Sequence, residues 1–344
     1  MEPSEVYDAA VVGAGPIGLE LAVALKRAGL RYIHFEARQI GHTISWFAPF
    51  TQFFSSNERI AIAGVPLFTP NQAKATREEY LAYLRAIVRQ FDLSIHTYER
   101  VISIDRHAGY FELTTQPSAG PVRSWRARAV ILSTGGTDRP RRLNVPGENL
   151  PHVSHYFQDP HTYFGRRLLI VGGKNSAVEA ALRCHHAGAK VCLSYRGQCL
   201  PENSIKYWLM PEISGLINSG RIEAFFQTIP REILPGRVIL TRGSEPLEVP
   251  ADFVLLLIGY EQDPSLFEQA GVQLVGESRA PFFNPETMET NVPGLFVAGT
   301  ASAGTQKKFA VFIENCHVHV ERILAALTGR KPHPPAVEFE EPET

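Results

Sequence analysis

The stretch from Asp8 to Glu36, DAAVVGAGPIGLELAVALKRAGLRYIHFE, constrains the fold more than any other part of the chain. Residues 9–12 form an apolar run typical of a buried parallel strand, and the G-x-G-x-x-G of residues 13–18 follows at once. Residues 19–28 then predict a helix, and residues 31–35 predict a second strand that ends at Glu36. This order of elements predicts a dinucleotide-binding unit rather than a tight turn in an α/β protein that binds no nucleotide.

Each glycine of this motif has its own task. Gly13 permits the tight turn, Gly15 leaves room for a pyrophosphate beside the backbone, and Gly18 lets the helix pack closely on the strand. The phosphates are expected at the helix N-terminus. Glu36 is expected to accept hydrogen bonds from the ribose hydroxyls of an adenosine.

Residues 168–196 repeat the pattern at a constant offset of 159 residues. The corresponding pairs are Gly13 and Gly172, Gly15 and Lys174, Gly18 and Ala177, and Glu36 and Tyr195. A repeat over so long a distance indicates two dinucleotide-binding domains in one chain. The predicted fold is therefore α/β, with two nested Rossmann-type domains.

The differences between the two copies predict different nucleotides. A carboxylate at Glu36 suits a free ribose diol, whereas Arg196, next to Tyr195, can hold a 2′-phosphate as a planar fork. Lys206 can add a second charge, which makes NADPH the expected ligand of the second copy. The alternative for Arg196 and Lys206 is a solvated surface pair.

We expect the second domain to be inserted in the first. The expected first domain covers residues 1–157 and 263–330, the second covers 158–262, and residues 331–344 form a flexible tail. The buried strand 253–260 belongs to the second domain, and the helix 309–327 belongs to the first.

The irregular stretch 37–76 is rich in aromatic residues and is expected to be ordered over a ligand. Its aromatic side chains can wall a flat ring or simply fill the core, and both readings stay open. They are Trp46, Phe47, Phe50, Phe53 and Phe54.

Composition excludes several classes of function. The net charge of the 344-residue chain is −1, with 34 Lys and Arg against 35 Asp and Glu, so neither nucleic acid nor a membrane surface is an expected partner. No apolar run is long enough to span a bilayer, and the acidic N-terminus is no signal peptide. The four cysteines fit no zinc site, so no metal is expected, and free thiols indicate a cytoplasmic location.

Two nested units with a glutamate in the first and an arginine in the second resemble the FAD- and NADPH-dependent reductases of the thioredoxin-reductase type. Residues 133–135 (STG), 258–260 (IGY) and 290–294 (TNVPG) fit that group. The C-x-x-C of thioredoxin reductases is absent. The chain is more similar to the bacillithiol-disulfide reductase family, through residues 53–56 (FFSS) and 312–315 (FIEN). Val65-Pro66, residues 155–157 (HYF), 172–177 (GGKNSA) and 195–197 (YRG) also match that family.

The resemblance implies FAD in the first domain and NADPH in the second. The implied FAD-binding residues are Gly13, Gly15, Pro16, Ile17, Gly18, Glu36, Ala37, Ser45, Trp46, Gln52, Val101, Thr134, Gly135, Gly299 and Asn315. The implied NADPH-binding residues are Gly172, Gly173, Lys174, Asn175, Ser176, Tyr195, Arg196, Lys206, Gly259 and Tyr260.

One position departs from the family pattern. Members from Firmicutes carry a cysteine inside the first glycine loop, where this chain has Ile17, and isoleucine cannot form a mixed disulfide. Cys316 is a conceivable substitute, early in the expected helix 309–327, where a helix N-terminus would lower the pKa of its thiol. The alternative for Cys316 is a small buried helix residue.

The resemblance implies a cytoplasmic NADPH-dependent flavoenzyme of redox homeostasis that reduces a low-molecular-weight disulfide, such as bacillithiol disulfide, or another electron acceptor. A homo-oligomer, dimeric or tetrameric, is expected. Ser45-Trp46 and His155 also resemble the flavin-monooxygenase pattern, so a monooxygenase is one alternative. A flavoprotein that senses redox state without catalysis is the other.

Overall fold

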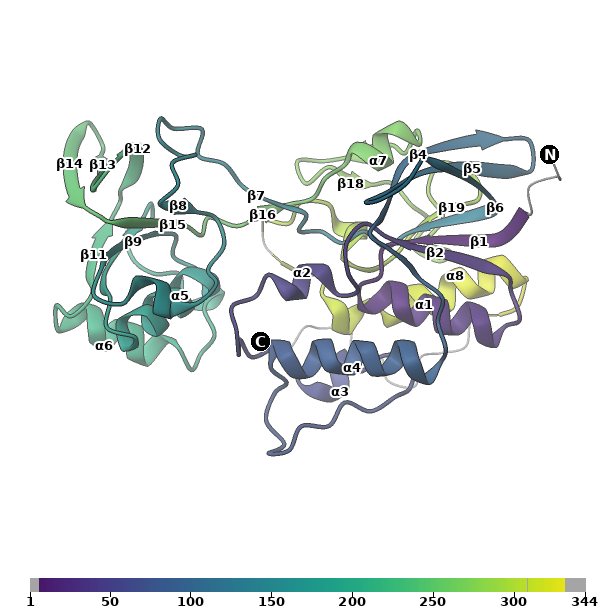
Figure 1. Cartoon of the computed structure of the whole chain (residues 1–344), viewed down its shortest axis with the longest axis horizontal. Coiled ribbons are helices and arrows are strands. Elements are labelled where there is room, and N and C mark those ends of the chain that lie inside the picture. Colours follow the sequence, from purple (N-terminus) through teal and green to yellow (C-terminus); the bar gives the residue numbers. More distant parts are fainter. Residues whose placement is uncertain (1–5, 308, 332–344) are drawn as a thin grey trace. The chain divides into compact units, whose positions relative to one another are not determined.

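The computed structural model describes residues 6–307 and 309–331, so almost all of the expected tail lies outside the described residues. The chain divides into two compact units. Unit 1 comprises Met1–Ser45, Phe50–Arg139 and Glu261–Thr344, and unit 2 comprises Trp46–Pro49 and Pro140–Tyr260 (Figure 1). Between unit 1 and unit 2 the main crossings fall at two short paired strands, β7 (Arg139–Pro140) and β16 (Tyr260–Glu261).

Unit 1 is built on a seven-stranded sheet in the order β3-β2-β1-β6-β5-β4, with β19 pairing β6. These strands are β1 (Val6–Val12), β2 (Tyr32–Glu36), β3 (His96–Thr97), β4 (Glu99–His107), β5 (Tyr110–Pro117), β6 (Arg123–Leu132) and β19 (Leu295–Val297). Strand β1 pairs in parallel with β2 and β6, whereas β4, β5 and β6 form an antiparallel meander. The glycine loop therefore leaves the carboxyl end of a central parallel strand, where open α/β sheets bind ligands.

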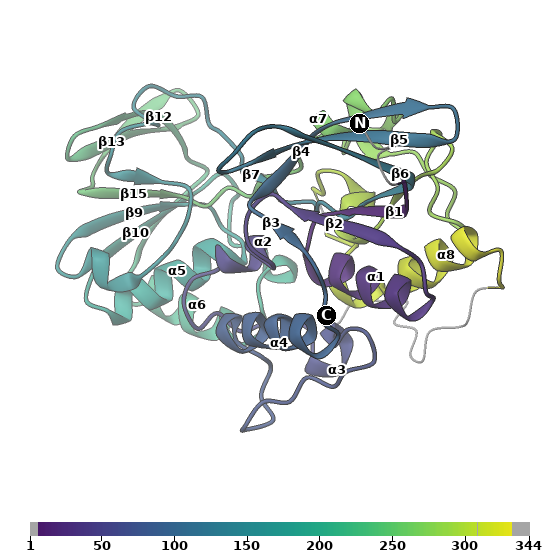
Figure 2. The same cartoon turned by 45° about the vertical axis from the view of Figure 1, so that its right-hand side comes forward.

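The helices of unit 1 gather mostly on one side of this sheet, with α1, α4 and α8 together (Figures 1 and 2). The helices are α1 (Pro16–Arg27), α2 (His42–Ser45), α3 (Asn57–Ile60), α4 (Arg77–Gln90), α7 (Ser265–Gln269) and α8 (His317–Thr328). Pro16 starts α1 with its fixed φ, and Thr76 with Glu79 forms a capping box at the start of α4. Short 3₁₀ turns lie at η3 (Gly299–Ala303) and η4 (Ile313–Asn315), and β17 (Leu274–Val275) pairs with β18 (Ala280–Pro281).

Unit 2 contains a five-stranded parallel sheet in the order β11-β10-β9-β15-β8 and an antiparallel sheet β12-β13-β14. The first sheet comprises β8 (Val153–Ser154), β9 (Arg167–Val171), β10 (Lys190–Tyr195), β11 (Glu223–Phe226) and β15 (Phe253–Leu256). The second comprises β12 (Ile229–Leu234), β13 (Arg237–Arg242) and β14 (Glu245–Pro250). The helices are α5 (Asn175–His186) and α6 (Met210–Asn218), with 3₁₀ turns η1 (Pro160–Tyr163) and η2 (Glu202–Ser204).

The repeat seen in the sequence is present in the structure with the same spacing. Strands β1 and β9 end at Val12 and Val171, and helices α1 and α5 begin at Pro16 and Asn175, so both pairs keep the offset of 159 residues. Each unit thus has a strand, a glycine loop and a helix of matching length.

The expected helix 309–327 is wrong in its first half, because α8 begins only at His317. The Asn315 side chain donates to the Ala310 carbonyl at 2.8 Å and accepts the Phe312 N–H at 2.9 Å, so it occupies a carbonyl that a helix would bond to the N–H of Glu314. The expected strand 253–260 is likewise shorter, since β15 ends at Leu256.

The first crossing between the units lies earlier than the expected boundary at 157. Residues 140–157 belong to unit 2, where Leu143, Val145, Leu150 and Val153 pack against its core. The returning crossing lies at Tyr260 and Glu261, two residues before the expected boundary.

The aromatic side chains of residues 37–76 have several environments. Phe53 packs in the core of unit 1 with its ring centroid 4.6 Å from that of Tyr80, whereas Phe50 is 72% exposed. Phe54 lies beneath the ammonium group of Lys74. The core-filling reading thus applies to Phe53.

Across the described ranges of the chain, no helix combines the length and apolar character needed to cross a membrane.

Candidate functional site

In the first glycine loop of unit 1, backbone atoms leave no room for a side chain at Gly13 or Gly18, whereas there is free space beside Gly15. A side chain on Gly13, which has φ +105°, would come within 2.5 Å of the Ser133 carbonyl oxygen. One on Gly18 would come within 2.0 Å of the Gly13 carbonyl oxygen, which is the close contact between helix and strand. A side chain on Gly15 would meet no atom within 4 Å. The space beside Gly15, at the N-terminus of α1, is therefore available to a phosphate group.

The carboxylate of Glu36 lies beside this loop at the end of β2. Its Oε2 accepts the backbone N–H of Ala14 at 2.8 Å, and its Oε1 accepts that of Arg38 at 2.8 Å. Burial raises the pKa of Glu36, although the two N–H donors and the charge of Arg100 act in the opposite direction. The acid is thus fixed at the loop with oxygen lone pairs still able to accept hydroxyl groups.

Three residues that were not among the predicted cofactor-binding residues hold this region. The Gly13 carbonyl oxygen accepts the Ser133 hydroxyl and lies 2.9 Å from His34 Nε2, and the Ser133 hydroxyl also contacts the Val12 carbonyl. The side-chain amide of Gln262 donates to the carbonyls of Gly135 and Ala301, at 3.1 and 3.0 Å. Ser133 directly precedes the predicted Thr134-Gly135 turn, which is the signal that could have identified it.

Thr134 offers an orphaned polar atom at the end of β6. Its hydroxyl oxygen is buried and has no hydrogen-bond partner among the described residues. An unpaired buried hydroxyl is costly, so a ligand atom at this position would satisfy it. Together with the open space at Gly15, this hydroxyl shows that unit 1 fits a bound dinucleotide.

The second glycine loop, in unit 2, is organised around an aromatic ring. A side chain on Gly172 would come within 2.4 Å of the Leu257 carbonyl, as a side chain on Gly13 would at Ser133. A side chain on Gly173 would come within 2.4 Å of the Tyr195 ring, and one on Gly197 within 2.5 Å of the same ring. Tyr195, the counterpart of Glu36, therefore lies between two glycines.

The two cations predicted to bind a 2′-phosphate differ in environment. Arg196 is exposed and makes no hydrogen bond or ion pair within residues 6–307 and 309–331. Lys206 is 8% exposed, and its ammonium group lies 3.2 Å from Glu179 Oε2 on α5. Its backbone N–H donates to the side-chain oxygen of Asn175 at 2.6 Å. Arg196 is thus the more available charge.

The other predicted FAD residues are spread over unit 1. Ile17 is buried and would lie 3.3 Å from a Cβ on Gly299, whose N–H donates to His319 Nδ1 at 3.1 Å. The Ser45 hydroxyl donates to the His42 carbonyl, the Val101 side chain is in the core, and Asn315 is hydrogen-bonded to the backbone of Ala310 and Phe312. Ala37 directly follows β2, and Gln52 forms an isolated antiparallel β-bridge with Thr76.

The remaining predicted NADPH residues of unit 2 lie at the start of α5 and after β15. Lys174 is the N-cap of α5, and Asn175 and Ser176 begin that helix. Gly259 has φ +100°, and its carbonyl accepts the Arg141 N–H at 3.0 Å.

Trp46 lies in unit 2 with two tyrosines. Its ring centroid is 5.4 Å from that of Tyr156 and 5.9 Å from that of Tyr260, and the two tyrosine centroids are 5.9 Å apart. Burial raises the pKa of Tyr260 to about 12, so its hydroxyl stays protonated. The structure therefore brings together a residue predicted for FAD and one predicted for NADPH.

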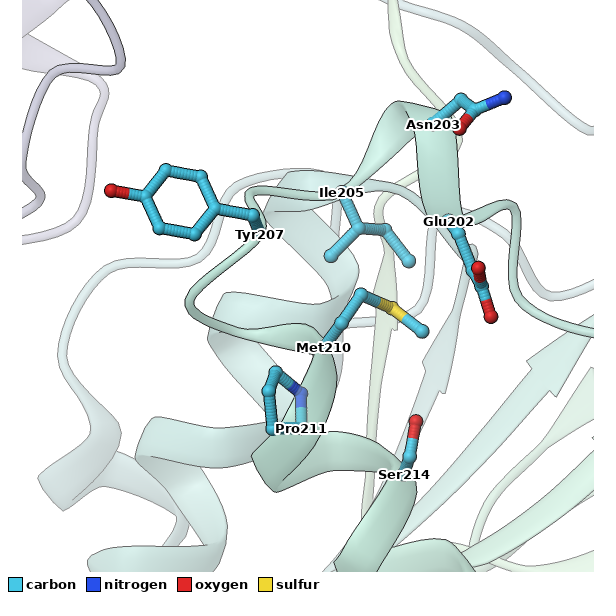
Figure 3. A pocket seen from close by; sticks show the side chains of 7 residues that line it. All are labelled: Glu202, Asn203, Ile205, Tyr207, Met210, Pro211 and Ser214. Atoms are coloured by element: carbon cyan, nitrogen blue, oxygen red, sulfur yellow. The ribbon is translucent and has the colours of Figure 1, made fainter. Parts of the chain in front are cut away.

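Unit 2 contains a cavity of about 370 Å³ that no residue of the glycine loop lines. Figure 3 shows its lining around the start of α6, formed by Glu202, Asn203, Ile205, Tyr207, Met210, Pro211 and Ser214. It includes none of the residues predicted to bind NADPH.

The structure does not support Cys316 as an accessible redox thiol. Cys316 is fully buried, immediately before α8, and burial raises the pKa of its thiol instead of the helix lowering it. The other cysteines, Cys184, Cys192 and Cys199, lie in unit 2. All four are free thiols.

Comparison with known proteins gives a consistent set of similarities. Residues 10–299 match the protein family described as "Pyridine nucleotide-disulphide oxidoreductase". The chain is 35% identical over 327 residues to "Bacilliredoxin reductase Bdr" of Bacillus subtilis, covering 94% of this chain and 98% of that protein.

Two solved structures are also similar. For "Bacillithiol Disulfide Reductase Bdr (YpdA) from Bacillus cereus" the TM-score is 0.90 at 34% identity, covering 95% of this chain and all of the other. The corresponding protein from Staphylococcus aureus gives a TM-score of 0.88 at 31% identity, covering 94% and 99%.

Proposed function

The chain belongs to the pyridine nucleotide-disulphide oxidoreductase family, and from this premise we propose that it is an FAD-dependent enzyme that uses NADPH to reduce a low-molecular-weight disulfide such as bacillithiol disulfide. The observation that carries the proposal is the pair of glycine loops. The strand that follows the first loop ends in the carboxylate of Glu36, and the strand that follows the second is succeeded by the guanidinium of Arg196, so the two sites carry opposite charges. The proposed disulfide substrate is inferred from the similarity to the Bdr proteins described above.

We assign FAD to unit 1. Gly15 and the N-terminus of α1 receive the pyrophosphate, because the loop leaves that space open and helical N–H groups face it. Glu36 accepts the ribose hydroxyls, and the unpaired Thr134 hydroxyl donates to the cofactor. The Glu36 carboxylate is already held in place by the backbone N–H groups of Ala14 and Arg38.

We assign NADPH to unit 2. The N-terminus of α5, with Lys174 as its N-cap, receives the pyrophosphate, and Arg196 receives the 2′-phosphate. The ring of Tyr195 fixes the loop between Gly173 and Gly197. Lys206 supports the site indirectly, because it is paired with Glu179 and holds Asn175 through its backbone.

Held by Gly15, Glu36 and Thr134, FAD would supply the two-electron redox chemistry between NADPH and the acceptor. The balanced reaction is NADPH, one proton and one disulfide giving NADP⁺ and two thiols. The chain itself binds and orients the two nucleotides. Unit 1 has one cysteine among its described residues, the buried Cys316, so no accessible protein thiol is available there as a carrier.

The deciding experiment is stopped-flow reduction of the purified flavoprotein by NADPH, followed by reoxidation with a panel of disulfides, quinones and oxygen. Fast reoxidation by bacillithiol disulfide supports the proposal. Reoxidation by oxygen with a substrate hydroxylated would instead indicate a monooxygenase. A protein that never binds flavin would contradict the assignment altogether.

A cytoplasmic location and a homo-oligomer, dimeric or tetrameric, are part of the same proposal. The four free thiols favour a reducing compartment. Analytical ultracentrifugation of the flavin-loaded protein measures the oligomeric state directly.

A further inference from the structure

A cluster of four charged side chains lies in unit 1 apart from the glycine loop. Glu20 is on α1, Arg59 on α3, Glu314 in η4, and His317 is the first residue of α8. The side chains of Glu20 and His317 are 14% and 16% exposed, and that of Glu314 is 1% exposed. None of the four has a role in the proposed chemistry, so their burial calls for another explanation.

The hydrogen bonds of His317 decide where its protons are. Its Nδ1 lies 2.7 Å from Glu20 Oε2, and its Nε2 lies 3.0 Å from the backbone carbonyl oxygen of Arg59. A carbonyl oxygen can only accept, so Nε2 carries a proton. The other carboxylate oxygen of Glu20 accepts the Ala63 N–H at 3.0 Å, so both oxygens are placed as acceptors and Nδ1 donates as well. His317 is therefore an imidazolium.

The charges of the cluster balance in this state. Arg59 lies 3.6 Å from Glu314, so these two compensate each other. The imidazolium of His317 then compensates Glu20. Burial on its own would lower the pKa of His317, but the hydrogen bond and charge of Glu20, the Arg59 carbonyl and the charge of Glu314 raise it.

The groups around the cluster do not titrate in the same range. Burial lowers the pKa of His319 on α8 to about 4, and burial raises the pKa of the adjacent Cys316 thiol. On α4, burial raises the pKa of Tyr80 well above its ordinary value and that of Tyr83 to about 12. Both tyrosine hydroxyls bond to the chain after Arg59, at the Ile60 and Ile62 carbonyls.

The cluster links helix α1 to the start of α8. Glu20 lies in α1, the helix that begins at the first glycine loop, and His317 starts α8 directly after Asn315 and Cys316. We propose that His317, as an imidazolium, is a positioning residue that holds α1 and the start of α8 in the arrangement that binds FAD. The inference rests on the proposed assignment of FAD to unit 1.

The pH dependence follows from the raised pKa. A histidine whose folded-state pKa is raised stabilises the fold fully below its ordinary value, and this stabilisation is lost as the pH rises through the folded-state pKa. The affinity of the unmodified protein for FAD is therefore expected to fall as the pH is raised from neutral into the alkaline range. The dissociation constant is measured from flavin fluorescence released on dilution.

His317→Gln keeps one N–H donor but cannot bond both acceptors or carry a charge. It should weaken FAD binding by about tenfold at neutral pH and remove the alkaline loss of affinity. Glu20→Gln keeps His317 but removes its counter-charge, and it should move the loss of affinity to lower pH. His186→Gln is the matched control, because His186 pairs with Glu212 at 2.5 Å on the surface of unit 2. It should leave both the affinity and its pH dependence unchanged.

A constant FAD affinity across this pH range in the unmodified protein would overturn the inference, and so would an alkaline loss that survives His317→Gln. Selective ¹⁵N labelling of histidine gives an independent readout, since both ring nitrogens of His317 should show the shift of protonated imidazolium. NADPH affinity, measured by fluorescence titration, should be the same in all variants. Failure of the proposed function looks different, because the unmodified protein would then bind no FAD at any pH.

Discussion

The ammonium group of Lys206 lies 3.2 Å from the carboxylate of Glu179, and both side chains are largely buried, at 9% and 16% exposure. This ion pair connects the loop after β10 to helix α5. It leaves Arg196 as the exposed cation at the strand end. The two residues should therefore respond differently to substitution.

Arg196→Ala should raise the KM for NADPH far more than the KM for NADH, because loss of a charge-assisted contact to phosphate costs about 1.5–3 kcal/mol. Lys206→Met should instead lower the free energy of unfolding by about 1–3 kcal/mol, since it removes the nearer cation from Glu179 and leaves only the longer 4.0 Å contact with Arg183. Steady-state kinetics with both nucleotides and chemical unfolding separate the two effects. Equal losses for NADPH and NADH in Arg196→Ala would contradict a 2′-phosphate contact.

Gly15→Ala and Gly18→Ala form a pair that tests the loop. A side chain at Gly15 meets nothing within 4 Å, so the flavin-free protein should keep its Tm while FAD binds more weakly. A side chain at Gly18 would come within 2.0 Å of the Gly13 carbonyl, so this variant should unfold at a clearly lower temperature. Calorimetry of the flavin-free proteins together with FAD titration checks both. An unchanged FAD affinity in Gly15→Ala would place the pyrophosphate elsewhere.

His34 should make unit 1 sensitive to acid. Burial lowers its pKa from 6.5 to about 4, with the Gly13 hydrogen bond opposing and His96 adding to the decrease. The unfolded chain then takes up the proton first, so the free energy of unfolding should fall by about 3 kcal/mol over this pH interval. His34→Gln keeps a donor for the Gly13 carbonyl but does not titrate, and denaturant unfolding at neutral and acidic pH should show a shallower loss. The same acid loss in that variant would assign the effect to other groups.

Ile17→Cys tests whether disulfide reduction benefits from a thiol in the glycine loop. The substitution leaves Gly13, Gly15 and Gly18 unchanged, so FAD should still bind. We expect bacillithiol-disulfide turnover to increase relative to the unmodified protein, while reduction of the flavin by NADPH stays equally fast. Cys316→Ala should leave turnover unchanged because that thiol is buried. Fast turnover in the unmodified protein that does not increase in Ile17→Cys would show that no loop thiol is required.

Local patterns made both nucleotide-binding loops predictable. The positions of Gly13, Gly18 and Gly172 are dictated by backbone contacts that only glycine can make, so the residue type itself carries the information. The start of α8 could not be predicted in this way. Residues 309–316 have a helical pattern of apolar side chains, but the Asn315 side chain takes the Ala310 carbonyl that a helix would bond to the N–H of Glu314.

The environments of the charged residues could not be predicted from the sequence either. In the sequence, Lys206 and Arg196 are both simply cationic residues. Only the fold shows that Lys206 is paired with Glu179. The same is true of Cys316, whose thiol is covered by elements distant in the chain. Long-range burial, which decides pKa and availability, is not encoded in a short motif.

The ring of Tyr195, held between Gly173 and Gly197, has a consequence for how this site can change over evolution or by engineering. A Cβ at Gly173 or Gly197 would come within 2.4 or 2.5 Å of the ring in its present position, so the effect of a substitution at either glycine depends on the residue at position 195. The three positions are therefore coupled. Replacing Tyr195 by an acidic residue to change the nucleotide preference would also remove the ring that both glycines face, so libraries should vary all three positions together.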